Sequence, residues 1–266
     1  MPKRKPNHLG GQAMASGVEL IQVTAKNLDE EGFFCYMSKR KAPGYAQKRD
    51  WLTERFAEGM KLTMAHENGG RTVGFIEYIP GEHAWRAVHA PGYLVIHCLW
   101  VVGKGKGKGY GSLLLQSCLD EARAGNHSGV VMLASDGVWL AKKELFLKHG
   151  FEEITQAAPS FRLLAKRFGK APLPSFPLDW EARAARFGAG LTVIRTSQCP
   201  YIEDAAKLAM DWAAAKGIPS RELAFHSAKE VQERSPSPYG IFGIVLDGRL
   251  LSYHYLLAKD FEQRLS

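Results

Sequence analysis

One stretch of the chain combines glycine and lysine at a spacing that suits the binding of a phosphate group. Residues 101–112 read VVGKGKGKGYGS, in which every second residue from 103 to 111 is a glycine. The apolar run 93–102 before it predicts a buried strand, and 112–126 after it predicts an amphipathic helix. Glycines at the start of a helix let backbone N–H groups point at an anion, and the helix dipole adds to the attraction. The position between two core elements therefore favours a phosphate cradle over a flexible basic linker.

The spacing of these glycines excludes two common phosphate-binding patterns. All five glycines of the run occupy odd-numbered positions. A Walker A loop needs two glycines five residues apart, and the dinucleotide fingerprint needs two that are three apart, so each would require a glycine at an even position. What remains is a pair of glycines two apart, Gly109 and Gly111, at the opening of a helix.

The same stretch resembles the pyrophosphate loop with which acetyltransferases of the GNAT superfamily bind acetyl-CoA. The family pattern is [Arg/Gln]-x-x-Gly-x-[Gly/Ala]; here Lys106 takes the first place, and Gly109 and Gly111 match the other two. Lysine keeps the positive charge of arginine but not its planar donor geometry. A second segment, LFLKHGF at 145–151, is similar to the family's late helix ending in Gly-Phe. The resemblance covers residues 18–168 and implies an α/β (α+β) fold of the GNAT acyl-CoA N-acyltransferase type.

The resemblance implies an N-acetyltransferase that moves an acetyl group from its cosubstrate, acetyl-CoA, to an amine of a small molecule or a peptide. The loop amides would bind the pyrophosphate, and the strand before the loop would splay and offer its backbone to the pantetheine arm and the thioester. The implied acetyl-CoA-binding residues are Leu99, Trp100, Val101, Lys106, Gly107, Lys108, Gly109, Tyr110, Gly111 and Ser112. For each lysine of the loop, a solvated surface position is an equally good interpretation.

Two residues are candidates for the base that takes a proton from the attacking amine. An alkyl ammonium has a pKa near ~10, so a base accelerates attack at neutral pH. His97, near the end of the predicted strand, has a suitable free pKa of about 6.5; a core histidine bonded to the backbone is the alternative. Glu77, in GFIEYIPGEHAW, is the second candidate. Strand alternation places Cys98 on the face opposite His97, which argues against an acyl-cysteine intermediate.

One position departs from the family pattern. Many relatives carry a tyrosine that protonates the departing thiolate, and the corresponding residue here is Phe146. Either the thiolate leaves unassisted, or another donor such as Tyr110 or a water supplies the proton. This departure keeps a second hypothesis open, a CoA-binding sensor without turnover.

The elements that would position these residues alternate along residues 18–168 in the order expected of such a domain. Hydrophobic periodicity and turn residues define them. Strands are predicted at 18–24, 61–67, 72–81, 93–102, 129–135, 151–156 and 160–166, with a hairpin turn at Asn68-Gly69-Gly70. Helices are predicted at 28–38, 48–60, 112–126 and 139–150.

A second, smaller domain is predicted at 189–266, beyond a proline-rich linker at 169–188. Its predicted order of strand, helix, strand, helix, two strands and helix resembles a thioredoxin-like fold, with Pro238 in the place of that fold's cis-proline. Cys199 stands at the first cysteine of the usual CxxC, whereas the second position is Ile202. A thiol at a helix N-terminus is a candidate for a lowered pKa, so a thiol-dependent redox protein acting through Cys199 is the third hypothesis. The pairing of the two domains resembles bacterial YoaP-type acetyltransferases.

Composition fits a globular protein of two modest domains. The chain has 266 residues, of which 45% are hydrophobic, and a formal net charge of +8. The basic residues are spread out, so a site for a small polyanion is a better expectation than a nucleic-acid surface. No apolar run reaches the ~18 residues of a membrane span, and no cysteine spacing suits a metal, so neither a membrane nor a metal is an expected partner. Residues 1–17 are expected to form a disordered basic tail without a secretory signal, which predicts a cytoplasmic protein with reduced thiols.

Overall fold

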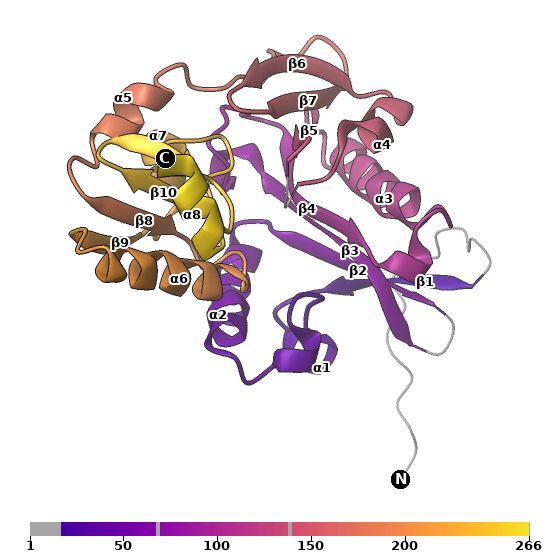
Figure 1. The fold of residues 1–266 in the computed structure, drawn as a ribbon. Helices are drawn as coiled ribbons and strands as arrows, with labels where there is room; N and C mark the ends of the chain where they lie inside the picture. The colour runs from indigo at the N-terminus through magenta and orange to yellow at the C-terminus, as the bar shows by residue number, and fades with distance from the viewer. Residues whose placement is uncertain (1–16, 68–69, 138–139, 266) are drawn as a thin grey trace.

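The computed structural model describes residues 17–67, 70–137 and 140–265, which form two domains side by side (Figure 1). Within these residues the larger domain contains a sheet of seven strands in the order β1-β2-β3-β4-β5-β7-β6. Neighbouring strands are antiparallel except β4 and β5, which run parallel. The strands are β1 (Val18–Val23), β2 (Lys61–Glu67), β3 (Arg71–Pro80), β4 (Leu94–Val101), β5 (Gly129–Ser135), β6 (Glu152–Ala157) and β7 (Phe161–Arg167).

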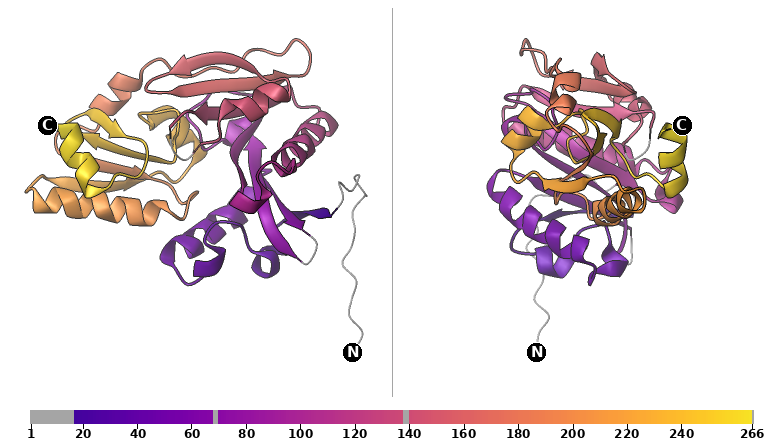
Figure 2. Two further views of the ribbon diagram at one scale, coloured as in Figure 1. Left: turned by 45° about the vertical axis from the view of Figure 1, so that its right-hand side comes forward. Right: turned by 60° about the vertical axis from the view of Figure 1, so that its left-hand side comes forward.

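Helices cover both faces of this sheet, as the turned views show (Figure 2). α3 (Tyr110–Ala124) packs its apolar stripe, which includes Leu114 and Cys118, against β3, β4 and β5. α2 (Pro43–Ala57) contributes Trp51 and Leu52 to a separate core on the other face. That second core continues into the smaller domain, so the face of the sheet opposite α3 lies toward the domain boundary.

The smaller domain has the predicted order of elements. Its strands form a sheet in the order β11-β10-β8-β9, in which β8 and β9 are parallel and the other pairs antiparallel. The elements are β8 (Leu191–Arg195), α6 (Ile202–Ala215), β9 (Ser220–Ala224), α7 (Ala228–Arg234), β10 (Phe242–Leu246), β11 (Arg249–Ser252) and α8 (Ala258–Leu265). The element order is thus confirmed, and the thioredoxin-like character of the domain stays a prediction. The cis-proline prediction is wrong at Pro238, because the cis bond of the described residues precedes Pro159.

The two domains share one continuous apolar core rather than being separated by a linker. The predicted linker 169–188 contains a helix, α5 (Trp180–Ala185), and its Ser175 pairs with His89 of the large domain. A Cβ added at Gly44 in α2 would lie 2.4 Å from the carbonyl oxygen of Pro200, just before α6. Because so close an approach needs a glycine, the seam between the domains is tightly packed.

Several predicted boundaries differ from the structure. The predicted helix 28–38 is wrong as one element: α1 (Leu28–Glu31) stops before Gly32, whose φ of +71° breaks the helix, and a 3-10 turn, η1 (Met37–Lys39), follows. The predicted helix 139–150 is reduced to α4 (Lys143–Lys148). The predicted tail up to residue 16 and the turn at 68–69 lie outside the described residues. Within the described part of the chain, no helix has the length and apolar character needed to span a bilayer.

Candidate active site

The site is built where β4 leaves β5. The parallel pairing of these strands covers three residue pairs, the last of them Ile96 with Met132, although β4 continues to Val101 and β5 to Ser135. β5 remains paired with β7 up to Ser135. The predicted splay of residues 97–101 is confirmed, and among the described strands none pairs with this edge of β4 beyond Ile96.

A β-bulge in β4 brings two consecutive side chains to the same cavity. Across from β3, Glu77 pairs with Cys98. The next pair joins Tyr78 with Ile96, which leaves His97 as the extra residue. His97 and Cys98 both line the cavity described below. The prediction that Cys98 faces away from His97 is therefore wrong, because strict alternation of side chains fails at a bulge.

The glycine run connects β4 to α3 as an exposed backbone turn. It begins with a turn of 3-10 helix, η3 (Gly103–Gly105), and Gly109 caps α3 with φ at +82°. Gly107 has φ at +80°, so both positions use the left-handed region that favours glycine. A Cβ built at Gly107 or Gly109 would meet no atom within 4 Å. The helix N-terminus and this open backbone fit the diphosphate of acetyl-CoA.

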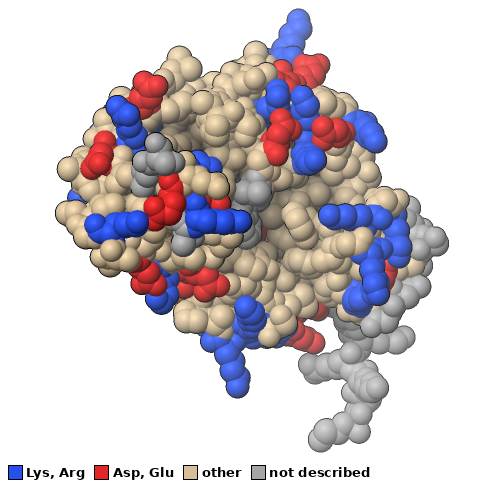
Figure 3. Space-filling view, in the orientation of Figure 1, with Lys and Arg blue, Asp and Glu red and all other residues tan. Residues whose placement is uncertain are grey.

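Lysine and arginine side chains gather on the side of the molecule where β1 and the start of α3 lie (Figure 3). Lys108 Nζ lies 2.9 Å from Oε1 of Glu67, and the Tyr110 hydroxyl donates to the same oxygen at 2.7 Å. Hydrogen bonds from Tyr110, Lys108 and Arg71 lower the pKa of Glu67 to about 2. Lys106 Nζ lies 5.7 Å from the ring centre of Trp100. The Tyr110 hydroxyl is thus engaged with Glu67.

A cavity of about 220 Å³ lies at the splay of β4, lined from both domains. The space-filling view shows the surface hollowed between the two lobes (Figure 3). The large domain contributes the polar side chains Lys48, Glu77, Arg86 and His97 and the aromatic ones of Phe34, Phe75 and Trp100. The small domain contributes Gln198, Cys199, Tyr201 and Tyr239. A cavity of this size with convergent polar groups fits a small molecule, and the second domain completes it.

Lys48 and Glu77 form a buried ion pair in the wall of the cavity. Their Nζ and Oε2 atoms lie 2.7 Å apart, and each side chain is only 3% exposed. Burial raises the pKa of Glu77, but the attraction of Lys48 and His97 outweighs it and holds the pKa well below its usual range. Glu77 is therefore ionised at neutral pH.

His97 faces Glu77 with a proton rather than with a lone pair. Its Nε2 accepts the backbone N–H of Trp85 at 2.9 Å, which assigns the proton of the neutral ring to Nδ1. Nδ1 lies 3.7 Å from Oε1 of Glu77, beyond hydrogen-bond distance. Burial lowers the pKa of His97 to about 4, although Glu77 opposes this shift. The pKa of His97 thus lies below the free value that suits a base, and its geometry is that of the alternative, a core histidine bonded to the backbone.

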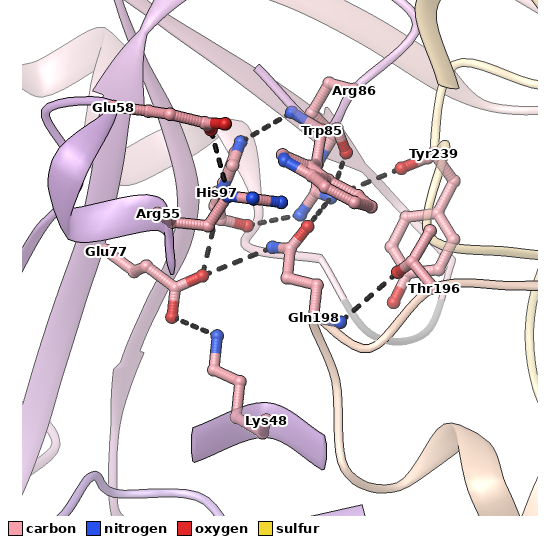
Figure 4. A network of polar contacts seen from close by, with 10 residues as sticks. All are labelled: Lys48, Arg55, Glu58, Glu77, Trp85, Arg86, His97, Thr196, Gln198 and Tyr239. Carbon is pink, nitrogen blue, oxygen red and sulfur yellow. Dashed lines mark hydrogen bonds and ion pairs between the residues drawn. The ribbon is translucent and has the colours of Figure 1, made fainter. Parts of the chain in front are cut away.

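Arg86 and Gln198 link the large domain to the small one (Figure 4). The Arg86 guanidinium donates to the backbone oxygens of Trp85, Tyr239 and His97. It also donates to Oε1 of Gln198 at 3.3 Å, while Nε2 of Gln198 donates to Glu77 at 3.3 Å. Arg86 donates a hydrogen bond to the carbonyl oxygen of His97, the bulge residue, and so helps to hold β4 away from β5.

Three cysteines, Cys35, Cys98 and Cys199, line the cavity, and all are free thiols. Burial raises the pKa of Cys98 to about 12. Burial also raises the pKa of Cys199 and outweighs the hydrogen bond from the backbone of Tyr201. Cys199, the candidate for a lowered pKa, therefore has a raised one. Among the described residues, no three His, Cys, Asp or Glu side chains form a group that could hold a metal ion.

Phe146, at the position of the family's tyrosine, belongs to the core. It is fully buried in α4 and packs edge-to-face on Phe151, with ring centres 5.4 Å apart. It contributes neither a hydroxyl nor a contact to the cavity.

Three polar residues of the cavity, Lys48, Arg86 and Gln198, were not predicted from the sequence. Lys48 had a signal, because it precedes Trp51 and Leu52 by three and four residues and so belongs to their buried helix face. Arg86 and Gln198 lie in irregular segments that only the packing of the two domains brings together, 112 residues apart.

Comparisons with known proteins agree with this architecture. Residues 25–151 match the model of the acetyltransferase (GNAT) family. Over 250 residues the chain is 30% identical to the uncharacterized N-acetyltransferase YoaP of Bacillus subtilis (strain 168), covering 92% of this chain and 98% of that protein.

Solved structures that are similar to part of this chain include two acetyltransferases. PaiA N-acetyltransferase from Thermoplasma acidophilum, in complex with coenzyme A, is 13% identical with a TM-score of 0.41 and covers 57% of this chain and 99% of its own. A GNAT family acetyltransferase from Brucella melitensis, in complex with acetyl-CoA, is 16% identical with a TM-score of 0.38. The match covers 60% of this chain and 96% of that one. The sequence matches carry the assignment: the chain belongs to the GNAT family of acetyltransferases, acyltransferases that take their acetyl group from acetyl-CoA.

Proposed function

We propose that the protein transfers the acetyl group of acetyl-CoA to an amine held in the cavity between its two domains. The observation that carries this proposal is the course of β4. Its bulge lines the cavity with His97 and Cys98, Trp100 follows in the cavity wall, and the glycine loop begins at Gly103. One short segment therefore joins an acceptor cavity to a diphosphate cradle, which supports the alignment of two bound substrates.

Acetyl-CoA supplies an activated acyl group, and the part of this chain is to bind and orient it. The loop amides would hold the diphosphate, and the unpaired edge of β4 would hold the pantetheine arm and direct an N–H at the thioester carbonyl. The residues proposed for these contacts are Leu99, Trp100, Val101, Lys106, Gly107, Lys108, Gly109, Tyr110, Gly111 and Ser112.

Glu77 is the residue we assign to the amine's proton, directly or through a water. It is ionised, it lines the cavity, and its Oε1 faces the N–H side of His97. His97 acts as a positioning residue in this scheme, because its lone pair is taken by the Trp85 amide. A carboxylate with so low a pKa is a weak base, so much of the deprotonation falls to bulk water and to the acceptor's own pKa.

The departing thiolate takes its proton from water in this scheme. Phe146 has no hydroxyl, and the Tyr110 hydroxyl donates to Glu67. The four free cysteines support a reducing compartment, so we place the reaction in the cytoplasm.

Calorimetric titration with acetyl-CoA and CoA, with ATP and NAD as controls, tests the donor half of the proposal. Selective binding of the two CoA compounds is expected. Release of CoA from acetyl-CoA in the presence of an amine panel then tests turnover. Binding without transfer to any amine would favour a CoA sensor, and no CoA binding would return the glycine loop to a basic surface turn.

A further inference from the structure

Arg86 brings a positive charge into the cavity, and the hydrogen-bond acceptors that the described residues offer it are all neutral oxygens. Its four acceptors are three backbone carbonyls and the amide oxygen of Gln198. Arg86 is 2% exposed, and its Nε–H is buried without a hydrogen-bond partner in the described residues. The carboxylate of Glu77 is already paired with Lys48. A buried guanidinium with an unpaired donor and no carboxylate partner is costly by itself, and a bound anion would offset that cost with charge-assisted hydrogen bonds.

The charges of the cavity wall sum to one positive charge. Lys48 and Glu77 neutralise each other across 2.7 Å. His97 is neutral, because its ring carries one proton and accepts the Trp85 amide. Arg86 stays protonated at any ordinary pH. The cavity is therefore complementary to an acceptor that carries one negative charge when its amine is neutral and ready to attack.

The arrangement of Glu77 and Arg86 separates a place for an amine from a place for an anion. Gln198 lies between them, with Nε2 donating to Glu77 and Oε1 accepting from Arg86 (Figure 4). Glu77 and Arg86 thus line the same cavity and are separated by the amide side chain of Gln198. An ammonium or amine suits the Glu77 side, and a carboxylate suits the Arg86 side.

We propose that the acceptor is a small aminocarboxylate, an amino acid or a close analogue, whose carboxylate binds Arg86 while its amine faces Glu77. This inference rests on the proposed acetyl transfer. The volume of about 220 Å³ limits the size of the acceptor, and the walls formed by Phe34, Phe75 and Trp100 favour an apolar side chain. The amine nitrogen forms a bond to the acetyl carbon while the C–S bond breaks with its electrons on sulfur. Of the two protons that the ammonium loses, one ends on the CoA sulfur and the other in solvent.

Matched acceptors test the role of the carboxylate on the native protein. L-Leucine, L-leucinamide and 3-methylbutylamine share one apolar side chain and differ in the group offered to Arg86. The other proteinogenic amino acids, each beside its amide, extend the series, and aryl amines and polyamines serve as unrelated acceptors. We expect kcat/KM for the best amino acid to exceed that of its amide by on the order of 100-fold, mostly through KM. The amide has the less basic amine, so intrinsic reactivity at neutral pH favours the amide, and a preference for the acid reports recognition.

A pair of arginine variants tests the residue. Arg86→Gln should raise KM for the amino acid by on the order of 100-fold and abolish the preference over the amide. Arg183→Gln is the matched control: Arg183 is also buried, at 8% exposure, but it bonds Asp179 and the backbone of Gln232 away from the cavity. If Arg86→Gln does not fold, Arg86→Lys keeps the charge and removes the fork geometry, which should still weaken the preference.

The outcomes separate this inference from the function on which it rests. Transfer to amines at equal or better rates without a carboxylate would overturn the inference and leave acetyl transfer standing. Binding of acetyl-CoA without transfer to any acceptor of the panel would overturn both. An unchanged acid-to-amide ratio in folded Arg86→Gln would remove Arg86 from the acceptor site.

Discussion

Two carboxylates on neighbouring strands lie in opposite surroundings, one beside the glycine loop and one inside the cavity. Glu67, at the end of β2, keeps 16% of its side chain exposed and accepts hydrogen bonds from Lys108 and Tyr110 beside the glycine loop. Glu77, in β3, is 3% exposed and pairs with Lys48 inside the cavity. Both have a lowered pKa, through hydrogen bonds at Glu67 and, at Glu77, through attractions that outweigh burial.

The contrast between the two carboxylates indicates which kind of contact should matter most in each region. Around Glu67 the charges are solvated, so water and salt weaken them. We therefore propose that the backbone amides of the loop, rather than its side chains, carry the affinity for a diphosphate. Around Glu77 the charges are desolvated. Loss of either partner would leave the other charge buried and unpaired, which strongly destabilises the fold. The loop should therefore be sensitive to changes of its backbone and tolerant of changes to its side chains. The cavity should be sensitive to changes of its side chains.

The largest expected effect is the loss of acetyl-CoA binding in Gly109→Val. Gly109 has φ at +82°, which a β-branched residue strongly disfavours, and its Cβ would project into the open space where the diphosphate is proposed to lie. Calorimetry should show Kd raised by on the order of 1,000-fold. Gly103→Ala, in the same loop but without a positive φ and with open space for its Cβ, is the control and should bind normally. Tight binding by a folded Gly109→Val protein would break the cradle assignment.

Next in size is the destabilisation expected from Lys48→Met, which leaves Glu77 buried without its cation. The free energy of unfolding should fall by about 3–5 kcal/mol in urea titrations at neutral pH. Lys108→Met removes the half-exposed partner of Glu67 and should leave the urea midpoint almost unchanged. Equal losses in the two variants would erase the contrast between the two regions.

The pH dependence of that loss has a defined sign. In the native protein the folded pKa of Glu77 lies below its unfolded value, so the ion pair stabilises the fold above the unfolded pKa of about 4.3 and loses this contribution as pH falls toward the folded pKa. In Lys48→Met, burial raises the pKa of Glu77, and protonation relieves the buried charge. The stability difference between the native protein and the variant should therefore be largest at neutral pH and shrink below about pH 5. A difference that grows on acidification would contradict the assignment.

The two regions also differ in how far the sequence predicts them. The loop is local: the alternating glycines, the apolar strand before them and the amphipathic helix after them are contiguous, so Gly107 and Gly109 could be placed from spacing alone. The cavity is not local. Glu77 and His97 could be named from neighbouring strands, but the bulge that turns Cys98 to the same side leaves no mark in a pattern of alternation. Gln198 reaches Glu77 only because the second domain docks there, 121 residues further along the chain.

A smaller effect is expected in the pH dependence of kcat/KM, because the charges of the cavity should stay constant. Burial lowers the pKa of His97 to about 4 and the pKa of Glu77 is also low, so neither group changes its charge between pH 6 and 9 by this assignment. The rise of kcat/KM with pH should then follow the amine of the acceptor. For two acceptors whose amine pKa values differ by about one unit, the rising limb should move by about one pH unit. If the rise of kcat/KM instead stays near the free histidine pKa for both acceptors, and disappears in His97→Gln, then His97 is the base.

The smallest effect is expected at Cys199, where the cavity meets the start of α6. Burial raises the pKa of this thiol, so it is protonated at neutral pH and a poor nucleophile. Serine has nearly the same shape, and Cys199→Ser should keep kcat/KM for acetyl transfer within about twofold of the native value, since surface and near-isosteric changes without a chemical role cost little. Cys118→Ser, on the buried face of α3, is the comparison that reports on folding alone. Loss of transfer in Cys199→Ser with the fold intact, or rapid alkylation of Cys199 by iodoacetamide at pH 7, would show that burial fails to suppress the thiol and that the cavity holds a nucleophile after all.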